Sequence, residues 1–350
     1  MSYSLDERNV IIADSLEGLT YTQKRAFLCA ADEKHPQHIK YADLLIKSLG
    51  GGVYNKLKAL FCDRDYRNGV AQGLSSRGIT CVTIKSPDYP ELLKNTPELA
   101  GEIEAKIRGD CFAVVGSRRT SAGTLAACKK ISGELAQKFT VVTGIADGAD
   151  TAAIQGAVGS GNIICVLPGG HDYIYNSSNA ALIKEVEQKG LTISEWSPKT
   201  PVQKFMYSVR NRIIAGLARG VLVVSAPKKS GALITAGYAA DYGREVFAFP
   251  HSLGVSSGEG CNNLIKNGAM LCQNVLDILS DFGLEYKSEN IPLTAAEQKV
   301  FDCLRNSGSA HIQAIARAAG IKVFEAVTIL SSLEIKGLVA RSGGNTYQAV

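Results

Sequence analysis

Short apolar runs alternate with amphipathic segments through the middle of the chain. The runs with the length of a buried parallel strand are Phe112–Val115, Thr140–Thr143, Ile163–Leu167, Leu191–Glu195, Val221–Ser225 and Glu245–Phe249. The segments with helical spacing between them include Ser121–Phe139, Thr151–Val158 and Asn179–Lys189. This alternation predicts right-handed βαβ crossovers, so we expect residues 111–282 to form an α/β domain with a doubly wound, mostly parallel sheet.

The pattern differs on the N-terminal side of this region. Residues 1–85 contain short helical patterns, such as Tyr21–Ala31 and Tyr41–Leu49, divided by polar breaks and by Gly50–Gly52. These patterns predict a small helical domain, and the strand-like alternation of Arg77–Ile84 marks its end. Residues 86–110 begin with a turn-rich Ser-Pro-Asp-Tyr-Pro stretch and are expected to form a linker.

A third pattern follows the α/β region. Residues 283–292 read as a polar linker, and residues 293–350 hold three helical patterns, which are Thr294–Arg305, Ile312–Ala318 and Val323–Lys336. Apolar and turn residues for a terminal hairpin come after them, so we expect a winged-helix domain. Thr294 is followed three residues later by Glu297, which predicts a capping box on the first helix.

Composition narrows the class of protein. A chain of 350 residues suits two or three domains, and a net charge of +5 is too mild to establish a nucleic-acid binder by itself. No apolar segment has the length of a membrane span, and Met1–Glu7 lacks the regions of a signal peptide, so we expect a cytoplasmic protein without membrane contact. The nine cysteines form no CxxC pair and read as small buried hydrophobes, for instance Cys111, Cys165 and Cys303.

Four loops after predicted strands share the character of an anion site. They combine glycines that permit close backbone approach with hydroxyl groups or cations, at the edge where such sheets bind ligands. The residues concerned are Gly116, Ser117, Arg118, Arg119, Thr143, Gly144, Gly169, Gly170, Ser230, Gly231 and Thr235. Asp150 follows the second loop, and we expect it to cap the helix there rather than to oppose an anion.

A basic block precedes the fifth predicted strand. Residues 197–219 contain five basic residues and no Asp or Glu, which favours an external anion as their partner. The block includes Arg210, Asn211 and Arg212, which precede a short apolar turn, Ile213–Leu217. Either arginine could instead pair with a carboxylate such as Glu195 or Asp241. Upstream, Lys204 and Tyr207 place a cation near an aromatic ring, a combination that suits a flexible single strand of nucleic acid.

Several common motifs are absent. The chain has no GxGxxG dinucleotide fingerprint, no GxxxxGK[ST] phosphate loop, no GxSxG nucleophile elbow and no HExxH zinc motif. His35 and His38 have a spacing that could bind metal, but no thiolate or third histidine is nearby, so we expect no metal site. Hydride transfer and phosphate-loop ATP hydrolysis therefore lose support.

The order and spacing of several motifs resemble those of the DNA-processing protein A family (DprA, also called Smf). The motifs are Val115–Arg118, Thr143–Gly148, Arg210–Leu217, Ser230–Ala236, Gly243–Pro250 and Gly260–Ile265. The terminal regions resemble the helical, SAM-like N-terminal domain and the C-terminal winged helix of that family. Tyr207-Ser208 stands where the family usually has Phe-Pro, which is one sign of a divergent member.

The resemblance implies a fold, a function and a set of contacts. The family fold is an extended Rossmann domain that forms a homodimer and binds single-stranded DNA without a cofactor or metal. Its members are recombination mediators, not enzymes, which protect incoming DNA during natural transformation and load the RecA recombinase on it. By this resemblance Ser117 and Arg118 contact DNA phosphate, Lys204 and Tyr207 supply a cation and an aromatic ring, and Arg210 and Arg212 belong to the shared Arg-Asn-Arg motif.

Two other functions remain open from the residues. Leu167–Gly170 superficially resembles the PGGxGT motif of Rossmann-like phosphoribohydrolases, although His171 and Asp172 replace the Gly-Thr continuation. A nucleotide-processing enzyme is therefore an alternative. The winged helix could also read duplex DNA as a regulator, but its helical segments are not strongly basic, and a role in oligomerisation or partner docking is at least as well supported.

Overall fold

The computed structural model describes residues 50–63, 65, 69, 82, 89–94, 109–173, 179–196, 198–285 and 293–349. The predicted helices at residues 21–31 and 41–49, and His35 and His38, lie outside these residues, as does most of the strand predicted at residues 77–84. Helix α4 (Gly51–Cys62) is described, and it begins at the glycine stretch. Gly50, at a φ of 81°, precedes this helix, and Gly51 and Gly52 form its first turn.

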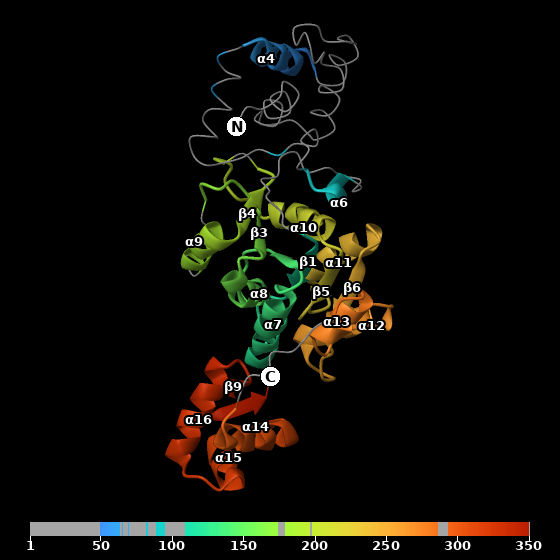
Figure 1. Ribbon diagram of the computed structural model, residues 1–350. Coiled ribbons are helices and arrows are strands. Elements are labelled where there is room, and N and C mark those ends of the chain that lie inside the picture. The colour runs from blue at the N-terminus through green and yellow to red at the C-terminus, as the bar shows by residue number, and fades with distance from the viewer. Residues whose placement is uncertain are drawn as a thin grey trace.

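A seven-stranded sheet forms the central layer (Figure 1). Its strands are β1 (Cys111–Val115), β2 (Thr140–Thr143), β3 (Ile163–Leu167), β4 (Leu191–Ser194), β5 (Gly220–Val223), β6 (Glu245–Ala248) and β7 (Met270–Leu271). The strand order is β4-β3-β2-β1-β5-β6-β7, and every pairing is parallel. The doubly wound α/β prediction is confirmed. The sequence missed only β7, whose two residues are too short to show a strand pattern.

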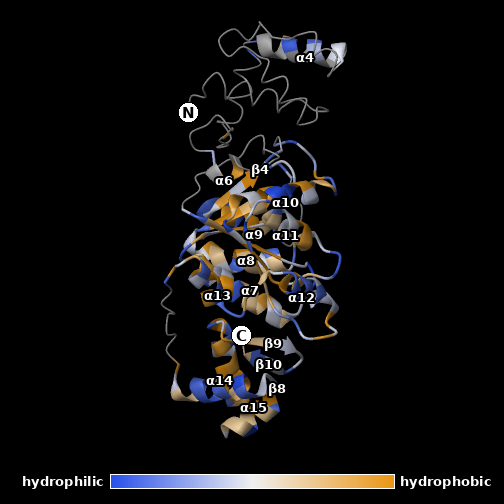
Figure 2. Cartoon of the chain, turned by 90° about the vertical axis from the view of Figure 1, so that its right-hand side faces the viewer, coloured by the Kyte–Doolittle hydropathy of each residue, from blue (hydrophilic) through white to orange (hydrophobic). Residues whose placement is uncertain are grey.

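Helices cover both faces of this sheet, and alternation along β1 shows why. Phe112 and Val114 pack into one core, whereas Ala113 and Val115 pack into the other. The first core lies under α7 (Ala122–Leu135), α8 (Ala149–Ala157), α9 (Ala180–Lys189) and α13 (Val275–Asp281). The second lies under α6 (Glu91–Lys94), α10 (Met206–Leu217), α11 (Gly231–Asp241) and α12 (Glu259–Lys266). Figure 2 shows hydrophobic segments between these layers and hydrophilic ones outside.

The region predicted as a linker contributes to the second core. Tyr89 and Leu93 are buried against residues of β1 and β5, together with Val82. The α/β domain therefore gains packing from residues that precede its first strand. Cys111 and Cys165 are buried free thiols as predicted, and burial raises their pKa, to about 12 for Cys111, whereas Cys303 is only half-buried.

Helices α7 and α8 approach closely where two glycines meet. A Cβ atom on Gly156 would overlap the carbonyl oxygen of Lys129 and lie 3.0 Å from the backbone nitrogen of Gly133. These are backbone atoms that cannot rotate away, so we expect Gly156→Ala to lower the free energy of unfolding by about 1–3 kcal/mol in chemical denaturation.

Gly159→Ala is the matched control for this substitution. A Cβ atom there meets no heavy atom within 4 Å, so we expect a change in the free energy of unfolding below about 0.5 kcal/mol. Equal losses for the two variants would show that glycine flexibility, and not the helix contact, explains the effect.

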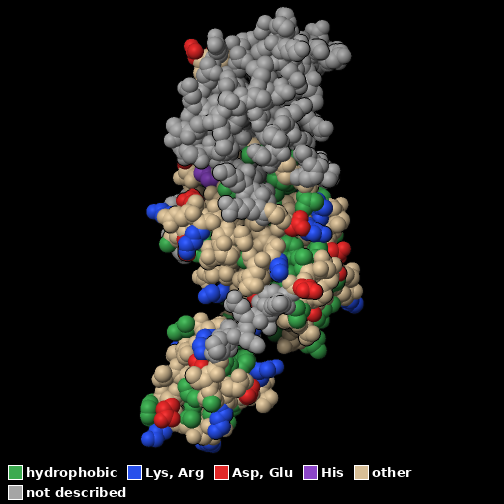
Figure 3. All heavy atoms as spheres, in the orientation of Figure 1, with side chains coloured by type: hydrophobic (Ala, Val, Ile, Leu, Met, Phe, Trp, Pro, Cys, Tyr) green, Lys and Arg blue, Asp and Glu red, His purple; other side chains and the backbone are tan. Residues whose placement is uncertain are grey.

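The C-terminal residues form a separate lobe below the sheet domain (Figure 3). Helices α14 (Ala295–Ser307), α15 (Ile312–Ala319) and α16 (Val323–Ile335) accompany a three-stranded sheet of order β8-β10-β9, as a winged helix requires. Strand β8 (Ser309–His311) lies between α14 and α15 in the chain, whereas β9 (Val339–Gly343) and β10 (Thr346–Ala349) follow α16. The capping box is present, since Thr294 N donates to Glu297 Oε2 (2.8 Å) and Glu297 N donates to Thr294 Oγ1 (3.2 Å). Within the described residues no helix is long and apolar enough to cross a bilayer.

Candidate functional site

A pocket of about 500 Å³ opens at the carboxyl ends of β1 and β5. The connections that leave the carboxyl ends of β1 and β5 run in opposite directions, because β1 leads to β2 on one side and β5 leads to β6 on the other. Doubly wound sheets bind their ligands at such a switch point. The pocket is lined by Val115, Gly116, Ser117, Arg118, Arg119, Ala146, Asp150, Tyr207, Arg210, Asn211, Ile214, Pro227, Lys229, Ser230, Gly231, Ala232, Thr235, Ser256 and Ser257.

Glycines let the loop after β1 turn tightly into the pocket. A Cβ atom on Gly116 would lie 2.7 Å from side-chain atoms of Ala149 and Val224. Gly148 has a φ of 79°, and a Cβ atom there would lie 2.6 Å from the carbonyl oxygen of Ser117 and 2.5 Å from that of Arg118. Ser117 N donates to Ser225 O (2.8 Å), which fixes the loop against the end of β5. Arg118 and the neighbouring arginine therefore project from a rigid turn and are exposed.

Helix α10 determines where Arg210 and Arg212 of the basic block lie. The apolar turn predicted at Ile213–Leu217 is wrong, because these residues continue a helix that begins at Met206. Residues two apart on a helix point about 200° apart. Both arginines are buried, but Arg210 lines the pocket, whereas Arg212 forms an ion pair with Glu195. Arg212 is therefore paired with Glu195, as one alternative predicted, and Arg210 lies in the pocket beside the carboxylate of Asp150.

A buried acid and a buried base form the floor of the pocket. Arg210 Nη1 donates to Val166 O (2.5 Å), and Asp150 Oδ2 accepts a hydrogen bond from Ala146 N (3.2 Å). A Cβ atom on Gly144 would overlap both charged groups, so a larger residue there would have to displace one of them. Burial raises the pKa of Asp150, and the nearby Arg210 opposes that rise. Burial likewise lowers the pKa of Arg210, against the effect of Asp150.

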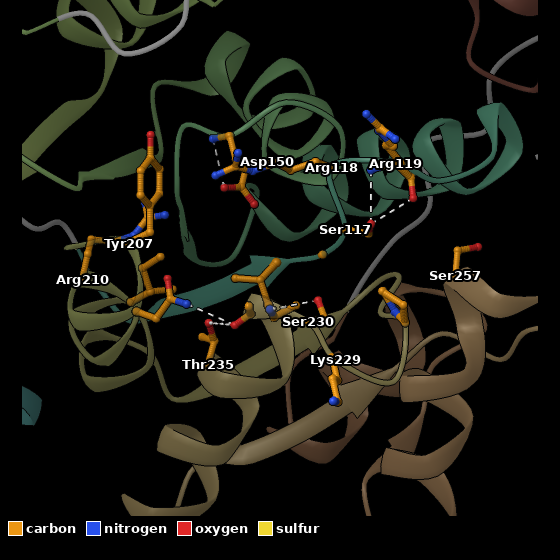
Figure 4. Close-up of a pocket in the computed structure, with 18 of the residues that line it drawn as sticks. Ser117, Arg118, Arg119, Asp150, Tyr207, Arg210, Lys229, Ser230, Thr235 and Ser257 are labelled. Atoms are coloured by element: carbon orange, nitrogen blue, oxygen red, sulfur yellow. Dashed lines mark hydrogen bonds between the residues drawn. The ribbon is translucent and has the colours of Figure 1, made fainter. Parts of the chain in front are cut away.

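Two guanidinium groups lie near the ring of Tyr207. The guanidinium carbon of Arg118 is 5.1 Å from the ring centroid, and that of Arg210 is 6.0 Å from it. Cations over an aromatic face are attracted by its quadrupole. The arrangement holds an aromatic ring and two positive charges together at one wall of the pocket (Figure 4).

The opposite wall comes from α11 and from the loop after β6. Ser230 caps α11 by accepting a hydrogen bond from Ala232 N (3.2 Å), so the positive end of that helix faces the pocket. Asn211 Nδ2 donates to Gly231 O (3.1 Å), which ties α10 to α11. Lys229, Ser230 and Thr235 lie on this side (Figure 4). Ser225 Oγ donates to Ser257 O (3.0 Å), and this bond holds the loop after β6 against the end of β5.

The structure gathers most of the predicted site residues but not all of them. Gly116, Ser117, Arg118, Arg119, Tyr207, Arg210, Asn211, Ser230, Gly231 and Thr235 line the pocket. Thr143 is fully buried and donates to Val114 O (2.7 Å), and Gly144 lies behind the floor. Lys204 is exposed just before α10, outside the lining, and Arg212 is used in its ion pair.

Gly169 and Gly170 belong to another part of the edge. Gly169 O accepts from Ser194 Oγ (2.8 Å), and Gly170 N donates to Thr200 O (3.0 Å). They join the loops after β3 and β4 and do not line the pocket. The glycine pair that resembled a phosphoribohydrolase motif is therefore used in a loop contact.

Sequence reasoning missed several lining residues. Asp150 was expected to cap α8, but Gly148 occupies the cap position and the Asp150 side chain lies on the pocket floor. Lys229 belongs to the predicted anion loop after β5, whose lysines were part of the prediction, although it was not named among the site residues. Ser256 and Ser257 reach the pocket from a loop that carries no anion-site pattern.

Two family models match consecutive parts of the chain. The model described as DNA recombination-mediator protein A matches residues 80–283, and that of the DprA winged-helix domain matches residues 287–345. The first match begins about where Val82 enters the core, upstream of the predicted boundary at residue 111.

Individual proteins show the same relationship. Protein Smf of Synechocystis is 36% identical over 242 residues, which are 65% of this chain and 59% of that protein. The DNA processing protein DprA of Streptococcus pneumoniae is 40% identical over 171 residues, 49% of this chain and 61% of that protein. The matches thus span about three fifths of the length of these two relatives.

Solved structures agree on the fold. The X-ray structure of DprA from Streptococcus pneumoniae has a TM-score of 0.66 at 28% identity, covering 82% of this chain and all of that one. The structure of DNA processing protein A from Helicobacter pylori, which was described for its single-stranded DNA binding mode, has a TM-score of 0.53 at 24% identity. It covers 58% of this chain and 94% of that one.

Proposed function

The chain belongs to the DNA recombination-mediator protein A family, known as DprA or Smf, and on that premise we propose that it binds single-stranded DNA in the pocket at the ends of β1 and β5. The observation that carries the proposal is the concentration of cationic and hydroxyl side chains around one aromatic ring. Arg118, Arg210 and Lys229 supply positive charge, and Tyr207 supplies the ring.

The polar groups of the pocket suit a phosphate. The Nε atom of Arg210 is buried and has no hydrogen-bond partner among the described residues. The N-terminus of α11 adds the positive end of a helix dipole. An anion that enters the pocket would meet the exposed side chains of Arg118 and Lys229, so the cost of its dehydration would be offset by charge-assisted hydrogen bonds.

The shape and the ring favour a single strand over a duplex. Tyr207 lines a hollow at the sheet edge, where an unpaired base can stack while its phosphate meets the arginines. A duplex keeps its bases stacked inside a stiff helix and offers only phosphates and groove edges. The name of the related Helicobacter pylori structure points to the same ligand for that protein.

The wider role follows from the family resemblance. We propose a non-enzymatic recombination mediator that needs no cofactor or metal, forms a homodimer through the Rossmann-like domain and loads the RecA recombinase on incoming DNA. The alternative of a nucleotide-processing enzyme is weakened, because Gly169 and Gly170 lie outside the pocket. The proposal that the winged helix reads duplex DNA is also weakened. The helix that would enter the DNA groove is α16, the second of the pair α15 and α16, and it exposes the apolar residues Phe324 and Val327.

Fluorescence anisotropy of a labelled single-stranded oligonucleotide tests the proposal. We expect binding whose log affinity falls with log salt by roughly 0.7 per phosphate contact. A duplex of equal length should compete poorly. Absence of binding at low salt, or equal competition by the duplex, would contradict the proposal, and release of a free base from nucleoside monophosphates would support the enzymatic alternative.

A further inference from the structure

An exposed aromatic ring lies at the start of α10, beside the pocket and outside its lining. The side chain of Phe205 is 54% exposed, and its ring meets that of Trp196 edge-on, with centroids 6.4 Å apart and an interplanar angle of 84°. Neither residue lines the pocket. The contact with Trp196 covers part of the Phe205 ring, but more than half of the Phe205 surface remains exposed to water.

The backbone around this pair is held firmly. Trp196 N donates to Ser194 Oγ (2.9 Å), and the loops after β3 and β4 are joined by the bond from Gly170 N to Thr200 O (3.0 Å). Phe205 O accepts hydrogen bonds from the backbone of the first turn of α10. The ring therefore projects from a rigid base, and a ligand that stacks on it would not need to order a loop.

Position connects this ring to the pocket. Phe205 precedes Tyr207 by two residues at the same end of α10, and Tyr207 forms a wall of the pocket. Two residues apart at a helix start, the two rings face different directions. A ligand longer than one nucleotide that lies against Tyr207 could therefore continue along the sheet edge, from the β1 loop toward the β4 loop, and reach Phe205.

Charge favours a nucleic acid as the occupant. Lys204 directly precedes Phe205 in the chain, Lys199 lies in the loop after β4, and both are exposed. No Asp or Glu occurs between residues 197 and 219. An apolar protein partner would gain nothing from this acid-free border, whereas a phosphate backbone would be attracted to it. Every base has a face that can stack on an aromatic ring.

We propose that Phe205, supported by Trp196, is a second stacking position for a base of the single strand that occupies the pocket. This inference rests on the proposed function. Lys199 and Lys204 then lie where the strand's phosphates pass. With a second stacking position, we expect affinity to increase when the strand is longer than the pocket alone accommodates.

The test compares Phe205→Ala with the wild type on thymidine oligonucleotides of about 4 and about 16 nucleotides, lengths that bracket common single-strand sites. We expect the ratio of long-strand affinity to short-strand affinity to fall roughly tenfold in the variant. Phe324→Ala is the matched control, since Phe324 is 65% exposed on the winged-helix lobe. It should leave the ratio at the wild-type value.

Trp196 provides a second measurement without mutation, because it is the chain's single tryptophan. A base stacked on Phe205 should change the emission of Trp196 when the long strand binds and leave it nearly unchanged with the short one. Equal loss of affinity for both strands in Phe205→Ala would show that Phe205 acts by supporting the structure of α10, and would overturn the proposal. No loss would also overturn it and leave the ring to a protein partner, whereas failure of the wild type to bind either strand would refute the proposed function itself.

Discussion

Replacing Arg118 with alanine is expected to weaken single-stranded DNA binding about 10- to 100-fold, because a charge-assisted hydrogen bond to phosphate contributes roughly 1.5–3 kcal/mol. The side chain is exposed on the rigid turn after β1, so its removal leaves no buried group without a partner. The slope of log affinity against log salt should decrease by roughly 0.7, the share of one phosphate contact. Anisotropy titrations at several salt concentrations measure both quantities.

A matched control separates local from general effects of charge. Arg305 is exposed on α14, and its guanidinium carbon lies 5.9 Å from the ring centroid of Phe301, much as Arg118 lies over Tyr207. Arg305→Ala removes the same charge from the winged-helix lobe and should change the affinity less than about twofold at physiological salt. Similar losses in both variants would place the DNA outside the pocket.

Replacing Arg210 with methionine is expected to destabilise the α/β domain by about 3–5 kcal/mol near neutral pH, because the ionised Asp150 carboxylate would remain buried without its cation. The two groups share the pocket floor behind Gly144. Arg219→Met is the control, since Arg219 pairs with Asp110 at 2.7 Å but both side chains are exposed, by 43% and 55%. That exposed pair should contribute less than about 1 kcal/mol.

The pH dependence of Arg210→Met has a definite sign. Loss of the arginine removes an influence that lowers the pKa of Asp150, so the folded-state pKa rises further above the unfolded value. The folded protein then takes up a proton more readily than the unfolded chain, and folding gains free energy as pH falls toward that raised pKa. The deficit relative to the wild type should therefore shrink as the pH is lowered from neutral toward the raised pKa of Asp150.

A second substitution keeps this prediction testable if the single variant folds poorly. Asp150→Asn in the Arg210→Met background removes the unpaired charge and retains an oxygen that can accept from Ala146 N. We expect partial recovery of the free energy of unfolding and a loss of its extra pH dependence. An equally unstable double variant would show that Arg210 acts mainly through its bond to Val166 O.

Local pattern was sufficient for the sheet and the winged helix. Buried parallel strands are continuous apolar runs, and those at Thr140–Thr143 and Ile163–Leu167 have the predicted bounds. Pattern was insufficient for α10, where Arg210 and Arg212 interrupt the apolar spacing from within a buried helix. A helix that buries charged side chains looks polar in sequence, so only its tertiary partners explain it.

By itself, the sequence determined the fold class, the family and the loops that supply cations and hydroxyls, because each depends on residues close together in the chain. Only the tertiary structure decided which charges remain for a ligand. The phase of α10 directs Arg210 into the pocket and Arg212 toward Glu195. The connection between β2 and β3, which contains α8, places Asp150 beside Arg210. Burial and pairing depend on groups that meet only when distant segments pack, so the sequence alone could not place these two arginines.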